Sequence, residues 1–456
     1  SLLVVRAYAG TGKTTTLVKY AHNNLNSRIL YIAYNRGIRD EAREKFPANV
    51  DCKTSHQLAY ATIGRSYQHK LTGNLRLTDI AQAVDTKNWT IAKDILDTLN
   101  ALMSSADFRI LYTHFARADT GKVLTTKQTQ YISQVVEGAE FVWSKMTTPE
   151  DPFPTVHDCY LKQYQLGMPN LSRRYTTILF DEAQDSNPVT SSIVLQQHCK
   201  VILVGDRHQQ IYRFRGANNA LDSKDLAGAD QLYLTHSWRF GRNVAIVANA
   251  LLELKGETLP VVGRGASDQV VMFLPQDVGH RTVIHRTVMG VIETALAATA
   301  KGKKVYWVGG IDAYQINELQ DIYWYAMAAP DRVRNKKLLD DFQDYGEYQE
   351  VAKATKDPEM SRAIKIIGSY DSLPDLLTLL RLNTVKEEFG ADITVSTAHR
   401  CKGLEWDNVQ LYDDFPDVLD PELDITTRDD EINLLYVAST RAMRVLALNS
   451  AVEMVI

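Results

Sequence analysis

A glycine-containing stretch near the start of the chain carries residue types that bind phosphate. AYAGTGKT occupies residues 7–14, after an apolar, strand-like run at residues 2–5 and before a segment with helical periodicity. In such a loop the backbone N–H groups point inward around phosphate oxygens, and the following helix adds its positive end. Lys13 would reach the β- and γ-phosphates, and the hydroxyl of Thr14 would bind Mg²⁺. The context indicates a nucleotide site, with Ala7 where the general pattern has glycine.

A second stretch, ILFDEAQD at residues 178–185, sets two carboxylates at the end of an apolar strand. In P-loop ATPases the aspartate at such a strand end, here Asp181, holds Mg²⁺. The neighbouring Glu182 can orient the attacking water and take its proton. An acidic pair at a strand end is, by itself, equally typical of a solvated loop. After a phosphate-binding loop, the catalytic interpretation is favoured.

A third stretch, VGDRHQQIYRFRGA at residues 204–217, combines amides, aromatic rings and cations. An amide such as that of Gln209 could sense the γ-phosphate. Tyr212, Phe214 and Arg215 are the types that grip a nucleic-acid strand, because exposed rings stack on bases and arginine neutralises phosphate. The alternative is that the two rings pack in the core beside surface arginines.

Several single residues gain a role only from this context. Trp238 and Arg239 offer a ring for a purine and a charge for the γ-phosphate, and Arg441 is a candidate arginine finger. A lone arginine on a helix is otherwise usually a surface residue. STAHRCKGLEWDNV at residues 396–409 sets His399 at a strand end, where a hydrogen-bonded loop histidine is the plain alternative.

Strand-like and helical segments alternate around these motifs, which predicts α/β domains with parallel sheets. Strands are expected, for example, at residues 28–34 and 270–275. Residues 61–172 and 311–390 instead repeat apolar residues at helical spacing. We therefore expect two α/β domains, each interrupted by a mostly helical insertion.

Composition narrows the class of protein. The 456 residues carry 51 Lys and Arg against 55 Asp and Glu, a net charge of −4. This is ordinary globular composition, which excludes a collagen-like or disordered chain, and no apolar run is long enough to predict a membrane span. Mild acidity argues against a histone-like binder but leaves room for a local basic groove.

The four cysteines form no CxxC pair, so neither a zinc ribbon nor a dithiol site is predicted. With no signal peptide, we expect an intracellular protein that is not secreted: nuclear in a eukaryote, cytoplasmic in a prokaryote or virus. A core strand that begins at residue 2 leads us to expect sequence upstream of it.

Taken together, the motifs resemble superfamily 1 DNA helicases of the UvrD/Rep type in order and spacing. In chain order they are AYAGTGKT, ILFDEAQD, VGDRHQQIYRFRGA, HSWRF, STAHRCKGLEWD and NLLYVASTRA. KTSHQLAY at 53–60, HDCYLKQYQLGMPNL at 157–171 and EINLLYVASTRA most resemble the helicase part of the F-box DNA helicase subgroup. The resemblance implies two RecA-like P-loop NTPase domains with ATP and Mg²⁺ in the cleft between them, and 3′→5′ movement along single-stranded DNA.

The resemblance also implies boundaries for these domains. The expected parts are 1–60 plus 173–245 for the first, ATP-binding core, 61–172 for its insertion, 246–310 plus 391–456 for the second core, and 311–390 for its short insertion.

Individual residues receive roles by the same resemblance. The expected catalytic residues are Lys13, Asp181, Glu182, Gln209, Arg239 and Arg441, with Thr14 and Asp181 holding Mg²⁺. The expected ATP contacts are Ala9, Gly10, Thr11, Gly12, Lys13, Thr14 and Thr15, with Trp238 on adenine and Glu405 on ribose. The expected DNA contacts are Tyr34, Asn35, His56, Tyr212, Phe214, Arg215, Arg286, Thr287, His399 and Lys402.

Two departures from the UvrD pattern are visible: Thr15 and Asn433 stand where arginine is usual, as they do in the F-box subgroup. The glutamine motif that reads adenine in this family precedes the first strand, and it is absent from these residues.

The implied activity is that of an ATP-dependent DNA helicase in repair, recombination or fork processing, acting on single strands and single–double-strand junctions. The alternative, motivated by the short second insertion, is a remodeler that strips recombinase filaments with little unwinding. A third reading, a non-catalytic ATP-binding scaffold, is disfavoured by the intact Glu182 and Gln209.

Overall fold

The computed structural model describes residues 1–115, 124–213, 219–355, 358–369 and 372–456. The chain forms two compact units. Unit 1 comprises Ser1–Ala7 and Lys13–Tyr233, and unit 2 comprises Tyr8–Gly12 and Leu234–Ile456. Residues 8–12 and 234–245 therefore group with unit 2, whereas the sequence assigned them to the first core domain. Backbone hydrogen bonds explain this grouping, because Tyr8 donates to Leu234 and Trp238 donates to Gly10.

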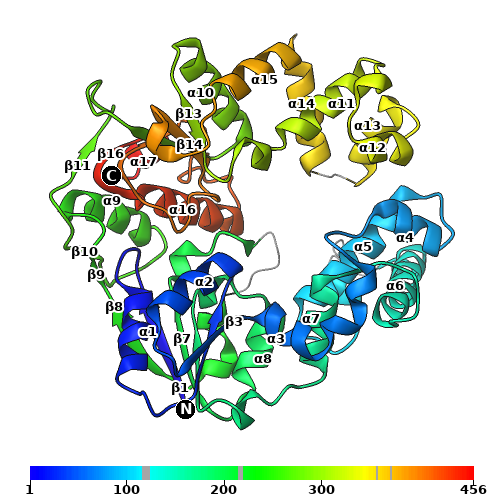
Figure 1. Cartoon of the computed structure of the whole chain (residues 1–456), viewed down its shortest axis with the longest axis horizontal. Helices are drawn as coiled ribbons and strands as arrows, with labels where there is room; N and C mark the ends of the chain where they lie inside the picture. The colour runs from blue at the N-terminus through cyan, green and yellow to red at the C-terminus, as the bar shows by residue number, and fades with distance from the viewer. Residues whose placement is uncertain (116–123, 214–218, 356–357, 370–371) are drawn as a thin grey trace. The chain divides into compact units, whose positions relative to one another are not determined.

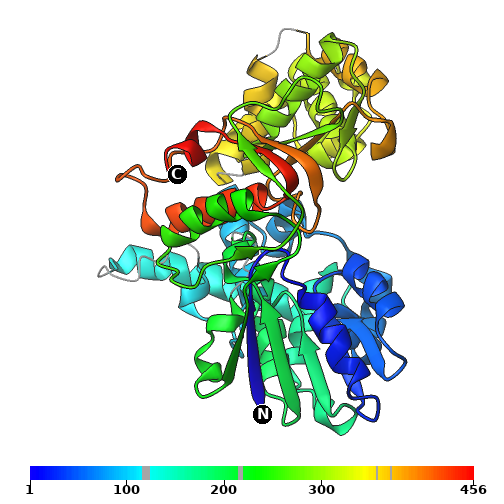
Figure 2. The ribbon, with the colours of Figure 1, turned by 90° about the vertical axis from the view of Figure 1, so that its left-hand side faces the viewer.

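A six-stranded sheet in the order β3-β2-β6-β7-β1-β8 forms the centre of unit 1 (Figure 1). Its strands are β1 Leu2–Ala7, β2 Ile29–Ala33, β3 Val50–Thr54, β6 Thr177–Phe180, β7 Lys200–Gly205 and β8 Asp230–Leu234. The pairs β1–β7, β7–β6, β6–β2 and β2–β3 are parallel. Figure 2 shows β1, in dark blue, alongside green strands that come much later in the chain. Parallel strands bring their carboxyl ends to one edge, which is where the sequence motifs lie.

One set of helices lies next to this sheet, and a second set forms the first insertion. Those next to the sheet are α1 Lys13–His22, α2 Arg36–Lys45, α3 Ser55–Thr62 and α8 Pro188–Leu195. The insertion contains α4 Leu77–Ala83, α5 Trp89–Ser104, α6 Thr126–Thr147 and α7 His157–Leu166, with the short parallel pair β4 Leu71–Thr72 and β5 Thr155–Val156. It has its own apolar core, which includes Ile95, Leu99 and Val135.

Two buried lysines stiffen the insertion. The ammonium of Lys70 donates to the carbonyls of Lys145, Thr148 and Asp151 at 2.8–2.9 Å, where α6 ends. Lys162, which is fully buried, donates to the carbonyls of Ser105 and Asp107, just after α5. Carbonyls at a helix end lack helical partners and carry partial negative charge, so each lysine fixes a helix terminus to its neighbours.

Unit 2 is built around a second six-stranded sheet, in the order β11-β16-β15-β12-β14-β13. Its strands are β11 Gln269–Val271, β12 Arg281–His285, β13 Val305–Trp307, β14 Ile393–Thr397, β15 Trp406–Leu411 and β16 Ala442–Ala447, and all neighbours are parallel. Associated helices are α9 Arg242–Glu253, α10 Val288–Ala300, α16 Ile425–Ser439 and α17 Ser450–Glu453, and a small parallel pair joins β9 His236–Ser237 to β10 Val262–Gly263.

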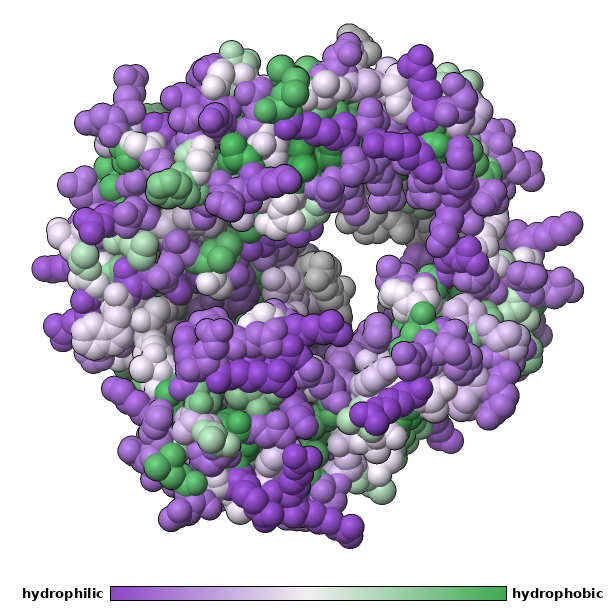
Figure 3. Space-filling model, viewed as in Figure 1, coloured by the Kyte–Doolittle hydropathy of each residue, from purple (hydrophilic) through white to green (hydrophobic). Residues whose placement is uncertain are grey.

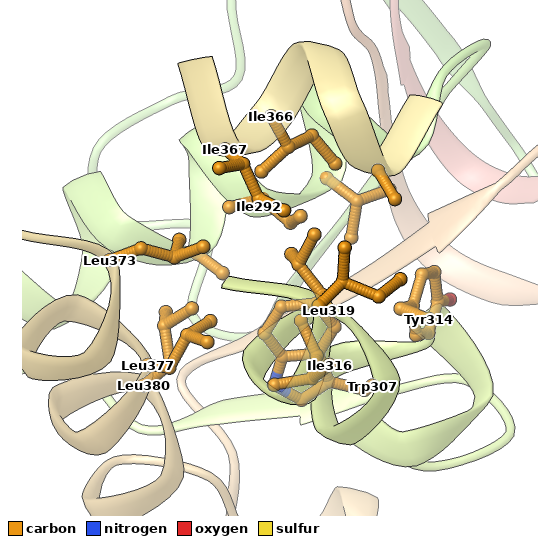
Figure 4. Close-up of a cluster of buried hydrophobic side chains, with 14 of the residues drawn as sticks. Ile292, Trp307, Tyr314, Ile316, Leu319, Ile366, Ile367, Leu373, Leu377 and Leu380 are labelled. Atoms are coloured by element: carbon orange, nitrogen blue, oxygen red, sulfur yellow. The ribbon is translucent and has the colours of Figure 1, made fainter. Parts of the chain in front are cut away.

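The second insertion shares its core with this sheet. It consists of α11 Ile316–Ala326, α12 Lys336–Asp341, α13 Tyr345–Thr355, α14 Pro358–Ser369 and α15 Leu373–Leu382. Leu319 and Leu377 from these helices lie in one apolar cluster with Ile292 of α10 and Trp307 of β13 (Figure 4). The insertion is therefore fused to the α/β layer of unit 2 and has no core of its own in the described residues.

The expected fold class, α/β with parallel sheets and helical insertions, is confirmed. Two strands differ from expectation. β11 ends at Val271 rather than continuing to residue 275, because Met272 and Phe273 turn into solvent. Strand β3 was missed, because VDCKT mixes polar and apolar residues at the sheet edge. Within the described ranges no helix is long and apolar enough to cross a membrane, and the face in Figure 3 is mainly hydrophilic.

Candidate functional site

The glycine loop joins β1 to α1 and needs glycine at two positions. Gly10 and Gly12 have φ angles of 73° and 79°, in the left-handed region that L side chains rarely adopt. A Cβ atom at Gly10 would lie 2.6 Å from the Cβ of Arg239, so there is no room for a side chain. The loop opens onto the N-terminus of α1 at Lys13, where free N–H groups and the helix dipole favour an anion.

Three of the expected catalytic side chains, together with Thr14, meet in unit 1 at the carboxyl end of β6. The Lys13 ammonium lies 3.5 Å from Oε1 of Glu182, and Thr14 Oγ1 lies 3.4 Å from Oδ2 of Asp181. The backbone N–H of Glu182 donates to Oδ1 of Asp181 at 2.9 Å. Glu182 has φ 51°, a strained conformation for a side-chain-bearing residue and one that recurs at functional sites.

The charge state of Asp181 reflects its burial. Burial, and next the neighbouring Glu182 carboxylate, raise the pKa of Asp181 to about 6, although the Lys13 ammonium opposes both. The Tyr31 hydroxyl donates to Oδ2 of Asp181 at 2.8 Å and fixes the carboxylate from the neighbouring strand β2. A carboxylate and a hydroxyl beside a phosphate-binding loop suit Mg²⁺, which takes few protein ligands and keeps phosphate and water oxygens. In the described residues, no cluster of three or more His, Cys, Asp or Glu forms an all-protein metal site.

A chain of polar contacts links Glu182 to Gln209. The amide of Gln184 donates to Glu182 Oε2 at 2.5 Å and accepts from the backbone N–H of Asp206 at 3.1 Å. Gln209 Nε2 then donates to Asp206 Oδ2 at 2.8 Å. Gln209 is nearly buried, at 4% exposed, so its position is set by this network.

The remaining expected ATP residues form a separate group in unit 2. Arg239 Nε donates to Oε2 of Glu405 at 2.6 Å, and its Nη1 donates to the carbonyl of Thr440 at 3.2 Å. Arg441 is 1% exposed, and donates to the carbonyls of Val437 at 2.8 Å and Leu404 at 3.2 Å.

The other residues expected at the ATP site, and the two departures from the UvrD pattern, lie in both units. Trp238 is 68% exposed, which leaves its ring open to solvent. The N–H of Ala9 donates to the Tyr436 hydroxyl at 3.0 Å. Thr15 is exposed on α1, and the carbonyl oxygen of the Asn433 side chain accepts from Lys255 Nζ at 2.7 Å. A lysine from the turn after α9 thus stands beside the position where arginine is usual.

Two of the expected DNA residues in unit 1 stack on each other. The rings of Tyr34 and Tyr212 lie 6.0 Å apart between centroids with an interplanar angle of 12°. Asn35 caps α2 through its side chain, which accepts from Ile38 N at 2.9 Å. His56 Nε2 lies 2.8 Å from Oδ1 of Asp158.

The two further expected DNA residues of unit 1, Phe214 and Arg215, lie outside the described residues.

In unit 2 the expected DNA residues Arg286 and Thr287 are engaged by carboxylates. Arg286 forms an ion pair with Glu431, and the Thr287 hydroxyl donates to Asp414 Oδ2 at 2.7 Å. His399 and Lys402 follow the end of β14 in a turn, and both are half-buried. Unit 2 thus holds its DNA candidates at the ends of β12 and β14, which pair in parallel.

Sequence reasoning missed the partners that orient these residues. They are Tyr31 for Asp181, Asp158 for His56, Asp414 for Thr287 and Glu431 for Arg286. Each partner is far from its target in sequence. The one available signal was position: Tyr31 lies in a fully buried strand next to the motif-bearing β6.

The glycine loop, its lysine and the acidic pair at the end of a parallel strand define a P-loop NTPase. Residues 1–225 match the UvrD/REP helicase N-terminal domain family. The F-box DNA helicase 1 of Gallus gallus is 32% identical, over 99% of this chain and 48% of the relative. The F-box DNA helicase protein 1 of Schizosaccharomyces pombe is 32% identical, over 99% and 56% respectively.

A bacterial relative is more distant: the ATP-dependent DNA helicase PcrA of Leuconostoc citreum is 26% identical, over 60% of this chain and 40% of its own length. The chain belongs to the UvrD-like superfamily 1 helicases and, within them, to the F-box DNA helicase subgroup. It spans about half the length of the F-box relatives that it matches.

Proposed function

We propose that the chain is the motor of an ATP-dependent DNA helicase that moves 3′→5′ on single-stranded DNA. The observation that carries this proposal is the grouping of Lys13, Thr14, Asp181 and Glu182 at the end of β6, beside the glycine loop. Phosphoryl transfer to water needs little beyond positioning and charge, and this group supplies both.

Each side chain has a defined task in the proposed hydrolysis. Lys13 exchanges its contact with Glu182 for the β- and γ-phosphates, which frees the Glu182 carboxylate to accept a proton from the attacking water. Thr14 and Asp181 hold Mg²⁺, which neutralises phosphate charge when bound. Gln209 contacts the γ-phosphate. Its hydrogen bonds through Asp206 and Gln184 connect this contact to Glu182.

A second set of residues is proposed to complete nucleotide binding. Arg239 and Arg441 neutralise the γ-phosphate, Trp238 stacks on adenine and Glu405 binds ribose. Arg239 and Glu405 are paired with each other at 2.6 Å, so nucleotide binding must exchange this ion pair for contacts with ATP. Such an exchange is feasible because an exposed ion pair is worth only about 0–1 kcal/mol.

DNA binding is proposed to rest on stacking and phosphate contacts. Tyr34 and Tyr212 present parallel rings, and base stacking is worth about 1–3 kcal/mol per base whatever the sequence. Weak sequence preference and a steep fall of affinity with salt are therefore expected. The further proposed contacts are Asn35, His56, Phe214, Arg215, Arg286, Thr287, His399 and Lys402.

The four-part division proposed from the sequence, two core domains and two insertions, accompanies this function. Unwinding of a duplex with a 3′ single-stranded tail, but not of one with a 5′ tail, tests direction. Lys13→Ala is the matched inactive variant. Equal unwinding of both substrates, or unwinding that survives Lys13→Ala, would rule the proposal out.

A second candidate is an ATP-driven remodeler that strips recombinase filaments with little unwinding. The observation that favours it is the second insertion, which packs in one core with α10 and β13 and is therefore held to the sheet (Figure 4). Filament removal from single-stranded DNA, measured beside unwinding, separates the two. Fast removal with negligible unwinding supports the remodeler.

A further inference from the structure

A single carboxylate fixes the backbone where β12 ends in unit 2. Asp414 Oδ1 accepts from the Arg286 N–H at 2.7 Å, and Oδ2 accepts from the Thr287 N–H at 2.9 Å and from the Thr287 hydroxyl at 2.7 Å. Thr287 also caps α10, because its hydroxyl accepts from Gly290 N at 3.0 Å. A Cβ at Gly290 would lie 2.4 Å from Asp414, so this carboxylate is packed tightly against the first turn of α10.

The side chain of Arg286 is held in an equally defined way. Its Nε lies 2.9 and 2.8 Å from the two oxygens of Glu431, and its Nη2 lies 2.7 Å from Oε1. The Glu431 side chain is only 6% exposed, whereas that of Arg286 is 33% exposed. Glu431 engages one edge of the guanidinium, and no described residue accepts from the other end, Nη1. The geometry leaves both N–H groups of Nη1 directed away from Glu431.

Glu431 lies on the helix that leads to the arginine group of unit 2. It is in α16, and every residue from Glu431 to the end of that helix at Ser439 is buried. Thr440 and Arg441 follow, and the Thr440 carbonyl accepts from Arg239. At 1.5 Å per residue, the nine steps from Glu431 to Thr440 span about 14 Å. One rigid helix therefore joins the partner of Arg286 to the backbone that holds Arg239 and Arg441.

We propose that Glu431 is a positioning residue that orients the Nη1 end of Arg286 towards a phosphate of the DNA strand. Through α16, DNA binding at Arg286 then affects the positions of Arg239 and Arg441, the arginines that act on ATP. This role rests on the proposed function, because it presumes that DNA stimulates ATP hydrolysis. A buried carboxylate beside a phosphate-binding arginine weakens long-range attraction to DNA. This carboxylate orients the guanidinium of Arg286. Its loss should therefore lower the stimulation of ATP hydrolysis by DNA more than it lowers the affinity for DNA.

The test measures ATP turnover with and without saturating single-stranded DNA, together with the melting temperature and the DNA concentration for half-stimulation. Glu431→Gln is expected to lower the ratio of stimulated to basal turnover by about fivefold or more, within the usual range of coupling energies. The DNA concentration for half-stimulation is expected to change much less.

Asp321→Asn is the matched control. Asp321 is a buried carboxylate of unit 2 that accepts from the N–H groups of Arg334 and Asn335, in the second insertion and outside the proposed machinery. This variant is expected to lower the melting temperature and leave the stimulation ratio unchanged. If Glu431→Gln behaves in the same way, the ion pair only holds the fold and the proposal is overturned.

A double variant distinguishes a loss of coupling from a folding defect. Glu431→Gln alone leaves Arg286 without its counter-charge, whereas Glu431→Gln combined with Arg286→Gln sets two neutral amides against each other. The proposal expects the double variant to regain melting temperature while the stimulation ratio stays low. A restored ratio would overturn it. Failure of the proposed function itself looks different, because the wild-type protein would then show no stimulation by DNA.

Discussion

The hydroxyl of Tyr31 donates to Oδ2 of Asp181 at 2.8 Å, across the parallel pair of β2 and β6. Tyr31 is fully buried, and burial, then the Asp181 carboxylate, raises its pKa far above the ordinary value. The phenol therefore stays protonated and always acts as a donor. A tyrosine of the sheet core thus orients the aspartate proposed to hold Mg²⁺, in the manner of the outer partners that orient metal ligands.

Tyr31→Phe should therefore affect both stability and metal use. Loss of one donor to a buried carboxylate is expected to lower the free energy of unfolding by about 1–3 kcal/mol. The Mg²⁺ concentration for half-maximal ATP hydrolysis is expected to rise severalfold. Tyr67→Phe is the matched control, because Tyr67 is buried and donates to the Thr147 carbonyl at 2.8 Å, away from the site. An unchanged Mg²⁺ requirement in Tyr31→Phe would contradict the positioning role.

His285 makes stability depend on pH. Burial lowers the pKa of His285 from 6.5 to about 4, and the ring lies between the Ser396 carbonyl and the Thr294 hydroxyl, at 3.1 and 2.7 Å. The unfolded chain binds this proton more readily, so stability is fully present above pH 6.5 and is lost as pH falls towards 4. The loss is about 3 kcal/mol for a shift of this size.

Urea unfolding at pH 7.5 and pH 5 measures this dependence. His285→Gln is expected to flatten it, because glutamine does not titrate. The exposed His22→Gln is the control and should leave it unchanged. If His285→Gln and wild type lose stability in parallel between the two pH values, His285 is not the source.

The two arginines of unit 2 should behave differently when removed. Arg441 is buried and donates to two carbonyls, so Arg441→Ala is expected to lower the free energy of unfolding by about 2–4 kcal/mol as well as ATP turnover. Arg239 pairs with the half-exposed Glu405, so Arg239→Ala is expected to lower turnover by about 10³-fold at a small cost in stability. Chemical denaturation and steady-state kinetics of both variants test this. If Arg239→Ala and Arg441→Ala lower the free energy of unfolding equally, the two arginines do not differ in this way.

The ring pair of unit 1 predicts a specific loss of DNA affinity. Tyr212→Ala is expected to weaken binding of single-stranded DNA by about 1–3 kcal/mol, with little dependence on base sequence. Tyr233, which is 56% exposed on β8, provides the control, and Tyr233→Ala should bind as wild type does. Fluorescence anisotropy with homopolymeric oligonucleotides measures both. Weakening by Tyr233→Ala to the same extent would mean that surface aromatics act non-specifically.

Local chemistry made much of this protein predictable from its sequence. The glycine loop, Lys13 and the Asp181–Glu182 pair follow from strand–loop–helix patterns within a few residues, and the family assignment followed from motif order. What could not be predicted is long-range pairing. Nothing near Arg286 in sequence indicates Glu431, and nothing near Asp181 indicates Tyr31. Strand β3 was missed because an edge strand with alternating polar residues lacks the apolar run that marks a buried strand.

The central claim is that Glu182 takes a proton from the attacking water during ATP hydrolysis, and that single-stranded DNA stimulates this hydrolysis. The most direct measurement is the rate of ATP turnover of wild type and Glu182→Gln, with and without single-stranded DNA. Stimulation of the wild type, and a fall of about 10²–10⁴-fold in Glu182→Gln while it still binds ATP, is the predicted result. An ATP turnover rate of the folded wild type that is the same with and without DNA would contradict the account. So would a Glu182→Gln variant that keeps its turnover.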